Sequence, residues 1–394
     1  MKFSLLLFLF YPFSFIFSQW VPKLTVPNSV LSSLHFPSPE VGYVVDNIGT
    51  IYKSSNAGEN WNVIYSNPNI ELKTVFFINE TIGFAAGSVL LKTIDGGNSW
   101  NVINTSSTGI IKIQFLNSQL GFFCGDNGLY KTIDGGNNWS QKSTFYVKSM
   151  SFPTPNVGYF HENVNSLYKT IDGGETWNLL ANNANPISTS LVSTLFFINE
   201  SKGFFGGYYY NAFTKTLDGG TNWDCVFSNC NIDFTGVGIK SIHFPTSNVG
   251  YATCNGGNNI NILKTIDGGE TWLPQNGNEL FTELFFTSEN TGYAISVNSL
   301  YKTNNGGSLN SQSFNSTKVK LYPNPTSSKL FIETEANINF PIRFELYSIL
   351  GRKLMSMNLD SSLYGIDLNE YSAGTYVYKL YNLDINTTGK VIKN

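Results

Sequence analysis

Carboxylates recur at one position of a repeated octapeptide, and paired carboxylates are the usual acid–base groups of glycoside hydrolases. The segment TIDGGNSW (93–100) returns with small changes in four later copies. Its aspartates are Asp95, Asp134, Asp172, Asp218 and Asp267. Thr and Asp side chains accept hydrogen bonds from turn amides, and Gly adopts backbone angles that other residues avoid. Because five equivalent active sites in one chain would be unusual, we interpret these aspartates as turn residues.

Other residues that could do chemistry do not form a recognisable site. Asp126, Asp224 and Asp233 are candidate carboxylates in variable loops, but acidic loop residues are usually just solvated. Nothing in the sequence pairs them at the separation a glycosidase needs. No nucleophile–base arrangement or phosphate-binding loop is present either.

The three histidines do not predict a metal site. His35 and His243 occupy equivalent positions in two non-adjacent repeats, and His161 occupies a different strand position. Such a placement makes a shared metal ion difficult, so we expect packing or channel-lining roles. The sequence predicts no metal and no cofactor.

One pattern recurs seven times from residue 34 to residue 310. Each copy has a strand-like segment ending in Phe, then Gly with an aromatic residue, then Lys with Ser or Thr, and then Trp. Phe and Gly are six residues apart in every copy, and Lys and Trp are eight apart in six copies. Val, Ile, Phe and Tyr dominate, so each copy predicts four short strands. Seven such units predict an all-β, seven-bladed β-propeller.

The register also predicts how the ring closes. The seventh copy has Asn310 where the others have Trp, whereas Trp20 stands ahead of the first repeat without a blade of its own. Trp20 precedes Phe36 by 16 residues, as Trp61 precedes Phe77. We expect residues 20–24 to form the outer strand of the last blade, which would leave no open sheet edge.

Loop lengths separate the two faces of the predicted ring. Turns between strands one and two and between strands three and four share one face, and their lengths are nearly constant. On the other face, the Gly-to-Lys distance runs from 9 to 14 residues. Variable loops on a rigid scaffold carry binding functions, so we place a binding site on this variable face.

The longest insertions flank the fifth and sixth repeats. They contain the candidate ligand-binding residues Tyr208, Tyr209, Tyr210, Asp224 and Asp233. Exposed tyrosines beside Asn-rich loops suit stacking on sugars or contact with a protein. Tyrosine is also common in β-strands, so an ordinary strand role is an equally good interpretation.

The TxDGGxxW turn resembles the Asp box (BNR-like repeat) of sialidases and many other propellers, where it is a structural turn away from the active site. A sialidase site needs arginines that clamp the substrate carboxylate. The only arginines are Arg343 and Arg352, after the last repeat. Sialidase activity is therefore excluded, and hydrolysis of another polysaccharide is the alternative to binding without catalysis.

The repeats as a whole, from residue 19 to about residue 310, resemble the photosystem II stability/assembly factor family of plants and cyanobacteria. The likeness lies in the GY…KTxDGGxxW pattern and implies the propeller fold. That family is thought to use an arginine-rich surface toward its membrane partners. The repeats here contain no arginine, so the resemblance does not transfer the function.

Residues 1–18 have the features of a secretory signal peptide. Lys2 precedes an apolar run that ends at Phe17, and Ser18 is a small residue suited to cleavage. No other segment is long and apolar enough for a transmembrane helix. In an exported chain, Cys225 and Cys230 are close enough to form a disulfide or to remain as thiols. Cys124 and Cys254 lie in different repeats, and we expect them to be buried thiols.

Charge divides the chain near residue 317. The net charge is −3, which argues against nucleic acid as a partner. Residues 1–317 carry −5 and residues 318–394 carry +2. We therefore predict a propeller over residues 19–312, a linker over 313–317 and a second domain over 318–394. Alternating apolar and polar residues in this last segment predict a small immunoglobulin-like β-sandwich.

Residues 318–394 resemble the type A C-terminal sorting domain of the type IX (Por) secretion system of Bacteroidetes. The likeness rests on motifs that contain Asn324, Pro325, Gly351, Arg352, Gly374, Tyr376 and Lys390. It implies that the type IX machinery delivers the chain to the cell surface or the medium. A generic adhesive sandwich is the alternative. The resulting hypothesis is an exported, non-catalytic binding propeller whose ligand is an extracellular glycan or protein.

Overall fold

The computed structural model describes residues 20–162, 166–180, 191–208, 213–226, 238–254, 260–276, 279–307, 319–334, 340–348, 352–382 and 386–394. These residues form strands and turns. The chain divides into two compact units, Met1–Asn310 and Ser311–Asn394. The predicted signal peptide, linker and domain limits at 312 and 318 lie outside the described residues, so they remain predictions.

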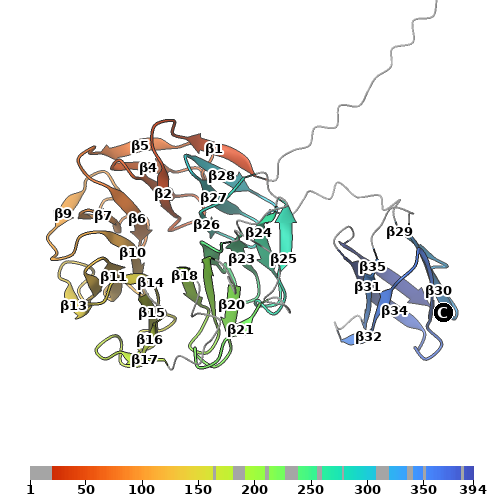
Figure 1. The fold of residues 1–394 in the computed structure, drawn as a ribbon. Helices are drawn as coiled ribbons and strands as arrows, with labels where there is room; N and C mark the ends of the chain where they lie inside the picture. The colour runs from red at the N-terminus through yellow and green to blue at the C-terminus, as the bar shows by residue number, and fades with distance from the viewer. Residues whose placement is uncertain are drawn as a thin grey trace, which may run out of the picture. The chain divides into compact units, whose positions relative to one another are not determined.

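Seven four-stranded antiparallel sheets make up the described part of the first unit, which is a seven-bladed β-propeller (Figure 1). Blade 1 contains β2 (Leu31–His35), β3 (Gly42–Asp46), β4 (Thr50–Ser54) and β5 (Asn62–Ser66). Blade 2 contains β6 (Leu72–Phe77), β7 (Gly83–Gly87), β8 (Leu90–Thr93) and β9 (Asn101–Ile103). Blade 3 contains β10 (Ile110–Phe115), β11 (Gly121–Gly125), β12 (Gly128–Thr132) and β13 (Ser140–Ser143). Blade 4 contains β14 (Val147–Ser151), β15 (Gly158–Glu162), β16 (Leu167–Thr170) and β17 (Asn178–Leu179).

The remaining blades follow the same order, with the first strand of each blade toward the centre of the ring (Figure 1). Blade 5 contains β18 (Leu191–Phe197), β19 (Gly203–Tyr208), β20 (Phe213–Thr216) and β21 (Asp224–Cys225). Blade 6 contains β22 (Ile242–His243), β23 (Gly250–Thr253), β24 (Ile260–Thr265) and β25 (Leu273–Asn276). Blade 7 contains β26 (Glu283–Phe286), β27 (Gly292–Ser296), β28 (Ser299–Thr303) and the N-terminal β1 (Val21–Thr25).

The ring closes as the sequence register predicts. β1 pairs antiparallel with β28, from Val21 opposite Lys302 to Thr25 opposite Ser299. Trp20 lies edge-on to Phe286 at 6.0 Å between ring centroids, as Trp61 lies edge-on to Phe36 at 5.9 Å. The N-terminal segment therefore supplies both the outer strand and the tryptophan of blade 7.

Neighbouring blades meet through a repeated stack of one aromatic ring, one Phe and one Gly. Tyr43 of blade 1 stacks on Phe77 of blade 2 at 3.5 Å between centroids. The other face of the Phe77 ring covers Gly83, where an added Cβ would lie 2.4 Å from ring carbons. Trp100 packs edge-on against the same ring at 6.0 Å. Only Gly leaves room for this arrangement, which explains the constant spacing of six residues between Phe and Gly.

All seven interfaces share this arrangement. The stacked pairs have centroids 3.5 to 5.3 Å apart and are Tyr43–Phe77, Phe84–Phe115, Phe122–Phe152, Tyr159–Phe197, Phe204–Phe244, Tyr251–Phe286 and Tyr293–Phe36. Burial of such rings stabilises each interface by about 2 kcal/mol per side chain. The stack links each blade to the next around the whole ring.

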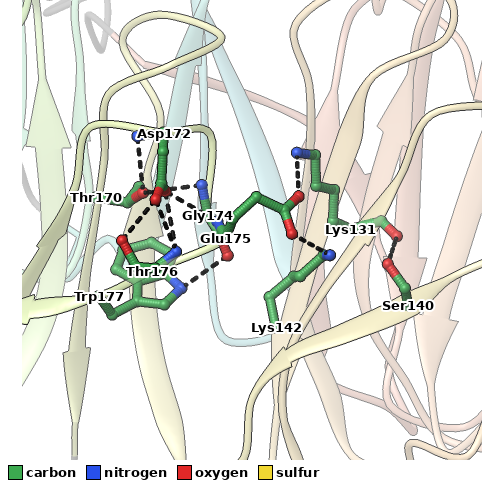
Figure 2. A network of polar contacts seen from close by, with 9 residues as sticks. All are labelled: Lys131, Ser140, Lys142, Thr170, Asp172, Gly174, Glu175, Thr176 and Trp177. Carbon is green, nitrogen blue, oxygen red and sulfur yellow. Dashed lines mark hydrogen bonds and ion pairs between the residues drawn. The ribbon is translucent and has the colours of Figure 1, made fainter.

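Lysines add polar contacts between the same blades. The last residue but one of each third strand is a lysine that points to the Asp-box turn of the following blade, as Lys53 does in donating to the carbonyl of Gly96 at 2.8 Å. Figure 2 shows Glu175 of blade 4 between Lys131 and Lys142 of blade 3, at 2.9 and 2.6 Å. Glu270 is held in the same way by two lysines of blade 5, and Glu59 by Lys23 and Lys302 at the ring closure. The third-strand lysines stand at the same repeat position in all seven blades.

The second unit is a two-sheet β-sandwich in its described residues. One sheet has the order β29 (Val319–Tyr322), β30 (Lys329–Thr334), β33 (Leu363–Asp367). The other has the order β32 (Lys353–Leu359), β31 (Ile342–Ser348), β34 (Gly374–Tyr381), β35 (Asn386–Lys393). Buried Leu330, Ile332, Phe344, Leu346 and Leu380 form the centre of its core. No helix in the described ranges could span a bilayer.

The stack makes a direct prediction about stability. Replacing Gly83 with Ala inserts a methyl group where the Phe77 ring already lies, so the ring must move away from Tyr43 and Trp100. We expect G83A to lower the free energy of unfolding by about 2 to 4 kcal/mol. Denaturant unfolding followed by tryptophan fluorescence measures the propeller alone, because the tail contains no tryptophan.

The matched control is Asn101→Ala, which changes an exposed residue of the same blade. It should alter stability by less than about 0.5 kcal/mol. Equal unfolding midpoints for G83A and the wild-type protein would contradict the role assigned to the stack.

Candidate functional site

The repeated aspartates lie in turns, and each carboxylate is engaged by its own turn. Asp95 Oδ1 accepts hydrogen bonds from Thr93 Oγ1 at 2.8 Å and from the backbone N–H of Ser99 at 2.9 Å. Its second oxygen, Oδ2, accepts from Ser99 Oγ at 2.6 Å. Asp172 repeats the pattern with Thr170 and Thr176, as Figure 2 shows. Both carboxylate oxygens accept hydrogen bonds from the turn and so stabilise the hairpin.

Hydrogen bonds from the turn hold the pKa of these carboxyl groups low. Bonds from Ser99 and Thr93 lower the pKa of Asp95 to about 2, and bonds from Asn138 are the largest cause of the same value for Asp134. Such groups are ionised at neutral pH and are weak bases, which suits neither partner of a general acid–base pair. In blades 1 and 7, Asn56 and Asn305 accept the equivalent bond from Ser54 or Thr303. A neutral amide can therefore fill this position.

The predicted ligand-binding residues are only partly described. Tyr208 ends β19, with its backbone opposite Leu191. Tyr209, Tyr210 and Asp233 lie outside the described residues. Asp224 requires a correction: it begins the outer strand β21 opposite Lys215, directly after the conserved turn. It therefore lies at the end of the blade away from the variable loops. The expectation placed it in an insertion, but that insertion begins only after β21.

The cysteines fall into two classes. Cys124 and Cys254 are buried free thiols, and burial raises the pKa of each to about 12. Cys225 is disulfide-bonded. Cys230 lies outside the described residues, so its pairing with Cys225 remains a prediction.

The first strands of the blades carry polar side chains that bridge to the next blade. Each first strand is the edge of its sheet, so some backbone N–H groups lack a ladder partner. The backbone N–H of Val75 donates to Ser33 Oγ at 3.4 Å, and that of Leu195 donates to Ser149 Oγ at 3.0 Å. Ser33 and Ser149 both stand three residues before the repeat Phe. Short polar side chains at this position thus satisfy the inner edge of the neighbouring sheet.

Two of the seven residues at this position depart from the Ser/Thr pattern. In blade order the residues are Ser33, Thr74, Lys112, Ser149, Thr194, Ser241 and Glu283. Glu283 of blade 7 accepts a hydrogen bond from Ser33 Oγ at 3.1 Å. Lys112 of blade 3 and Glu283 influence each other's pKa electrostatically, although they belong to blades on opposite sides of the ring. Both side chains keep partial solvent exposure.

Two histidines and a phenylalanine lie two residues further along the same strands. His35 and His243 lie 5.2 and 4.5 Å from Phe285, measured between ring centroids. The Nδ1 atom of each histidine accepts the backbone N–H of the next blade, Phe77 for His35 and Phe286 for His243. The proton of the neutral ring is then on Nε2. We call this group the axial cluster: Ser33, His35, Lys112, His243, Glu283 and Phe285.

Burial sets the protonation of the axial cluster. It raises the pKa of Glu283 to about 8, although Ser33, the Leu34 backbone N–H and Lys112 all favour the charged form. It lowers the pKa of His35 to about 3, with His243 adding to the effect, and that of His243 to about 4. At neutral pH the histidines are neutral and Glu283 is mostly a neutral acid. Burial also lowers the pKa of Lys112, while Cys124 and Glu283 oppose this.

The axial cluster contains hydrogen-bond donors and one cation. The described residues include no group of three His, Cys, Asp or Glu side chains able to hold a metal ion. Among the described residues of the first strands, Glu283 is the only carboxyl group. The arrangement can bind a polar ligand, but it lacks the second carboxylate of a glycosidase pair.

Motif residues of the tail lie at two places: Asn324, Tyr376 and Lys390 lie on or beside the last strand, and Arg352 lies at the turn between β31 and β32. Asn324 Nδ2 donates to the carbonyl of Lys390 at 2.7 Å, and the backbone N–H of Ile392 donates to Asn324 Oδ1 at 2.9 Å. Tyr376 OH donates to the carbonyl of Ser372 at 2.6 Å, and the backbone N–H of Arg352 donates to Ser348 Oγ at 3.2 Å. Gly374 begins β34, and Pro325 lies in the bend between β29 and β30. Gly351 lies outside the described residues.

Comparison with protein families assigns the tail. Residues 320–394 match the secretion system C-terminal sorting domain. The chain is therefore a propeller protein that carries a C-terminal sorting domain of the Por type. Among curated proteins, no match was found.

Solved structures with a similar fold are β-propellers of different functions. YCF48 bound to a D1 peptide has 16% identity and a TM-score of 0.59, covering 73% of this chain and 96% of that chain. YCF48 from Cyanidioschyzon merolae has 18% identity and a TM-score of 0.58, covering 72% and 98%. The GH74 enzyme of Niastella koreensis has 13% identity and a TM-score of 0.57, covering 95% and 74%. At such identities the likeness concerns the fold.

Inspection of the sequence missed Lys112 and Glu283. The signal was available in the alignment of the seven repeats, because both residues interrupt a column that otherwise holds Ser and Thr. The repeat Phe fixes that column, so a departure from it is informative. That Lys112 of blade 3 and Glu283 of blade 7 interact, however, follows only from the closed ring.

The raised pKa of Glu283 predicts a pH-dependent stability. The folded state holds this proton at pH values where the unfolded chain has released it, so stability falls as pH rises from about 4.5 toward 8. Glu283→Gln keeps the shape without the ionisation. We expect E283Q and the wild-type protein to be equally stable at pH 4, with E283Q more stable by about 2 to 4 kcal/mol at pH 8.

Denaturant unfolding at the two pH values measures the difference. Glu71→Gln is the control, since Glu71 is exposed and its contact with Lys73 is a long 3.4 Å. A stability gap between E283Q and the wild-type protein that does not change with pH would contradict this assignment.

Proposed function

We propose that this chain is an exported binding propeller without catalytic activity, delivered to the cell surface or the medium by the type IX secretion machinery. The sorting-domain match over residues 320–394 supports the export route. The ligand is an extracellular molecule, either a glycan or a protein. The mature chain is either attached at the outer membrane or released.

The state and placement of the described carboxyl groups support the proposal of binding without catalysis. The Asp-box aspartates are engaged in their own turns and have lowered pKa values. Glu283 has the raised pKa of a general acid, but the charged group that acts on it is Lys112 rather than a second carboxylate. Hydrolysis of a glycosidic bond by the usual route requires that second carboxylate as base or nucleophile.

Glycoside hydrolysis is the alternative that an activity test must exclude. We expect no release of reducing ends from xyloglucan, cellulose, pectin or starch by the purified protein at pH 5 to 8. A reducing-sugar assay with long incubation measures this, and E283Q serves as the control for contaminating hydrolases. Turnover by the wild-type protein that E283Q abolishes would overturn the proposal of binding alone and assign an acid to the reaction.

Export has its own test in the source bacterium. Removing residues 318–394 takes away the whole sorting-domain match, and we expect the shortened protein to accumulate in the periplasm. Cell fractionation followed by immunoblotting measures the distribution. Tryptophan fluorescence of the periplasmic protein verifies that the propeller has folded, because every tryptophan precedes the tail.

The full-length Asn101→Ala protein is the matched control and should reach the surface or the medium normally. Tail-deleted protein found outside the cell at the wild-type level would refute the role of residues 318–394 in export. This result would leave the binding activity open to its own test.

A further inference from the structure

The lysines of the propeller divide into two groups. Seven stand one residue before the ends of the third strands and contact the next blade. Three more, Lys23, Lys142 and Lys202, form ion pairs with the glutamates of Asp-box turns. Those ten are explained by the repeat register. Four others remain among the described residues, and all of them lie on or directly before a first strand: Lys73, Lys112, Lys148 and Lys240.

The four remaining lysines gather near the variable end of the ring. A first strand begins at the variable face and ends at its Phe near the conserved turns. Lys73, Lys148 and Lys240 stand four residues before that Phe, and Lys112 stands three residues before it. The propeller as a whole is acidic, so a concentration of cations at the inner strands is unexpected from composition.

Lys112 is the member of this group that stands in the Ser/Thr column of the first strands. Within the described part of the chain its ammonium forms no ion pair or hydrogen bond of its own, whereas Lys73 pairs with Glu71. The nearby acid, Glu283, is bound to Ser33 Oγ. A partly buried cation without a counter-charge is costly, and a bound anion would remove that cost.

The members of the axial cluster from blades 1, 6 and 7 are suited to donate hydrogen bonds. Glu283 in its neutral form carries an acidic O–H. The Nε2–H groups of His35 and His243 are not used by the inter-blade bonds, which engage Nδ1. Phe285 packs between the two imidazoles and adds an apolar surface. The cluster therefore has one cation, several neutral donors and an aromatic ring.

We propose that the axial cluster binds the carboxylate group of a small organic acid, with Lys112 as its cation and Glu283 as a hydrogen-bonding partner. This inference rests on the proposed binding function and names the chemistry of its ligand. One cation with neutral donors matches the single charge of a carboxylate. A phosphate dianion would need several cations or a guanidinium fork, and the propeller has no arginine.

The proposal predicts proton linkage. The groups that act on Glu283 are Ser33 Oγ, the Leu34 backbone N–H and Lys112, and Cys124 acts on Lys112. Ionisation of Glu283 places a negative charge beside the ligand and removes a donor. Affinity should therefore fall as pH rises through about 8, by up to about tenfold per pH unit.

The experiment is isothermal titration calorimetry on the secreted, full-length protein at pH 6, 7, 8 and 9. The probes are D-glucuronate and N-acetylglycine, which represent an acidic sugar and a peptide carboxyl end. D-Glucose and N-acetylglycinamide are their neutral counterparts, and inorganic phosphate is the competing anion. We expect at least one carboxylate to bind at pH 6, its neutral counterpart not to bind, and the affinity to fall toward pH 9.

Two variants test the residues. Lys112→Met should weaken binding of the carboxylate about tenfold or more, since it removes a charged hydrogen bond. Glu283→Gln removes the ionisable group, so the fall in its affinity from pH 6 to pH 9 should be smaller than that of the wild-type protein. Lys142→Met is the matched control, because it removes one lysine far from the cluster while Lys131 still holds Glu175. It should bind like the wild-type protein.

Each remaining result overturns the inference. These are absence of carboxylate binding at every pH, binding of phosphate alone, an unchanged affinity in K112M, or an unchanged pH profile in E283Q. Should K112M fail to fold by tryptophan fluorescence, the E283Q profile decides. A protein that binds a neutral glycan without turnover keeps the proposed function and loses only this inference, whereas hydrolysis of a polysaccharide removes the proposed function itself.

Discussion

The propeller depends on the contact between one phenylalanine ring and one glycine in each blade. The ring lies directly over the glycine, stacks on the aromatic residue of the preceding blade and receives a tryptophan edge-on. A single Cβ at the glycine would displace the ring and so disturb two blades. Because the last stack joins Tyr293 to Phe36, the ring is continuous only when all seven are formed. This explains why Phe, Gly and Trp hold their spacing while the loops on the variable face differ in length.

That packing leaves the inner edges of the sheets to be satisfied by side chains. Ser33 and Ser149 accept backbone N–H groups of the following blade, and His35 and His243 do so with Nδ1. Such positions need a small acceptor, and most blades have one. Lys112 cannot accept, and Glu283 is larger and more acidic than the task requires. Burying these two ionisable groups costs desolvation free energy, and neither group compensates for it by stabilising the ring. This is the physical reason to assign them to a ligand.

The blade count, the ring closure and the β-sandwich tail followed from the sequence because each is encoded in spacing. Trp20 stands in register with Phe36 as Trp61 does with Phe77, so its place in blade 7 could be counted along the chain. The axial cluster was not found that way, since its members come from blades 1, 3, 6 and 7. Asp224 was assigned to the wrong end of its blade because loop length was counted from Trp223 without allowance for the outer strand β21.

Repetition itself provides a way to recognise function in such a chain. When seven copies must solve the same packing problem, a residue that recurs at one position is explained by that problem, and the five Asp-box aspartates and the seven third-strand lysines belong to this class. Asn56 and Asn305 make the same turn contact as Asp95, so the turn does not require a charged side chain at this position. A residue that breaks the column at a costly place needs another cause. By this argument the informative carboxyl group of the propeller is Glu283, which occurs once, rather than the aspartate that occurs five times.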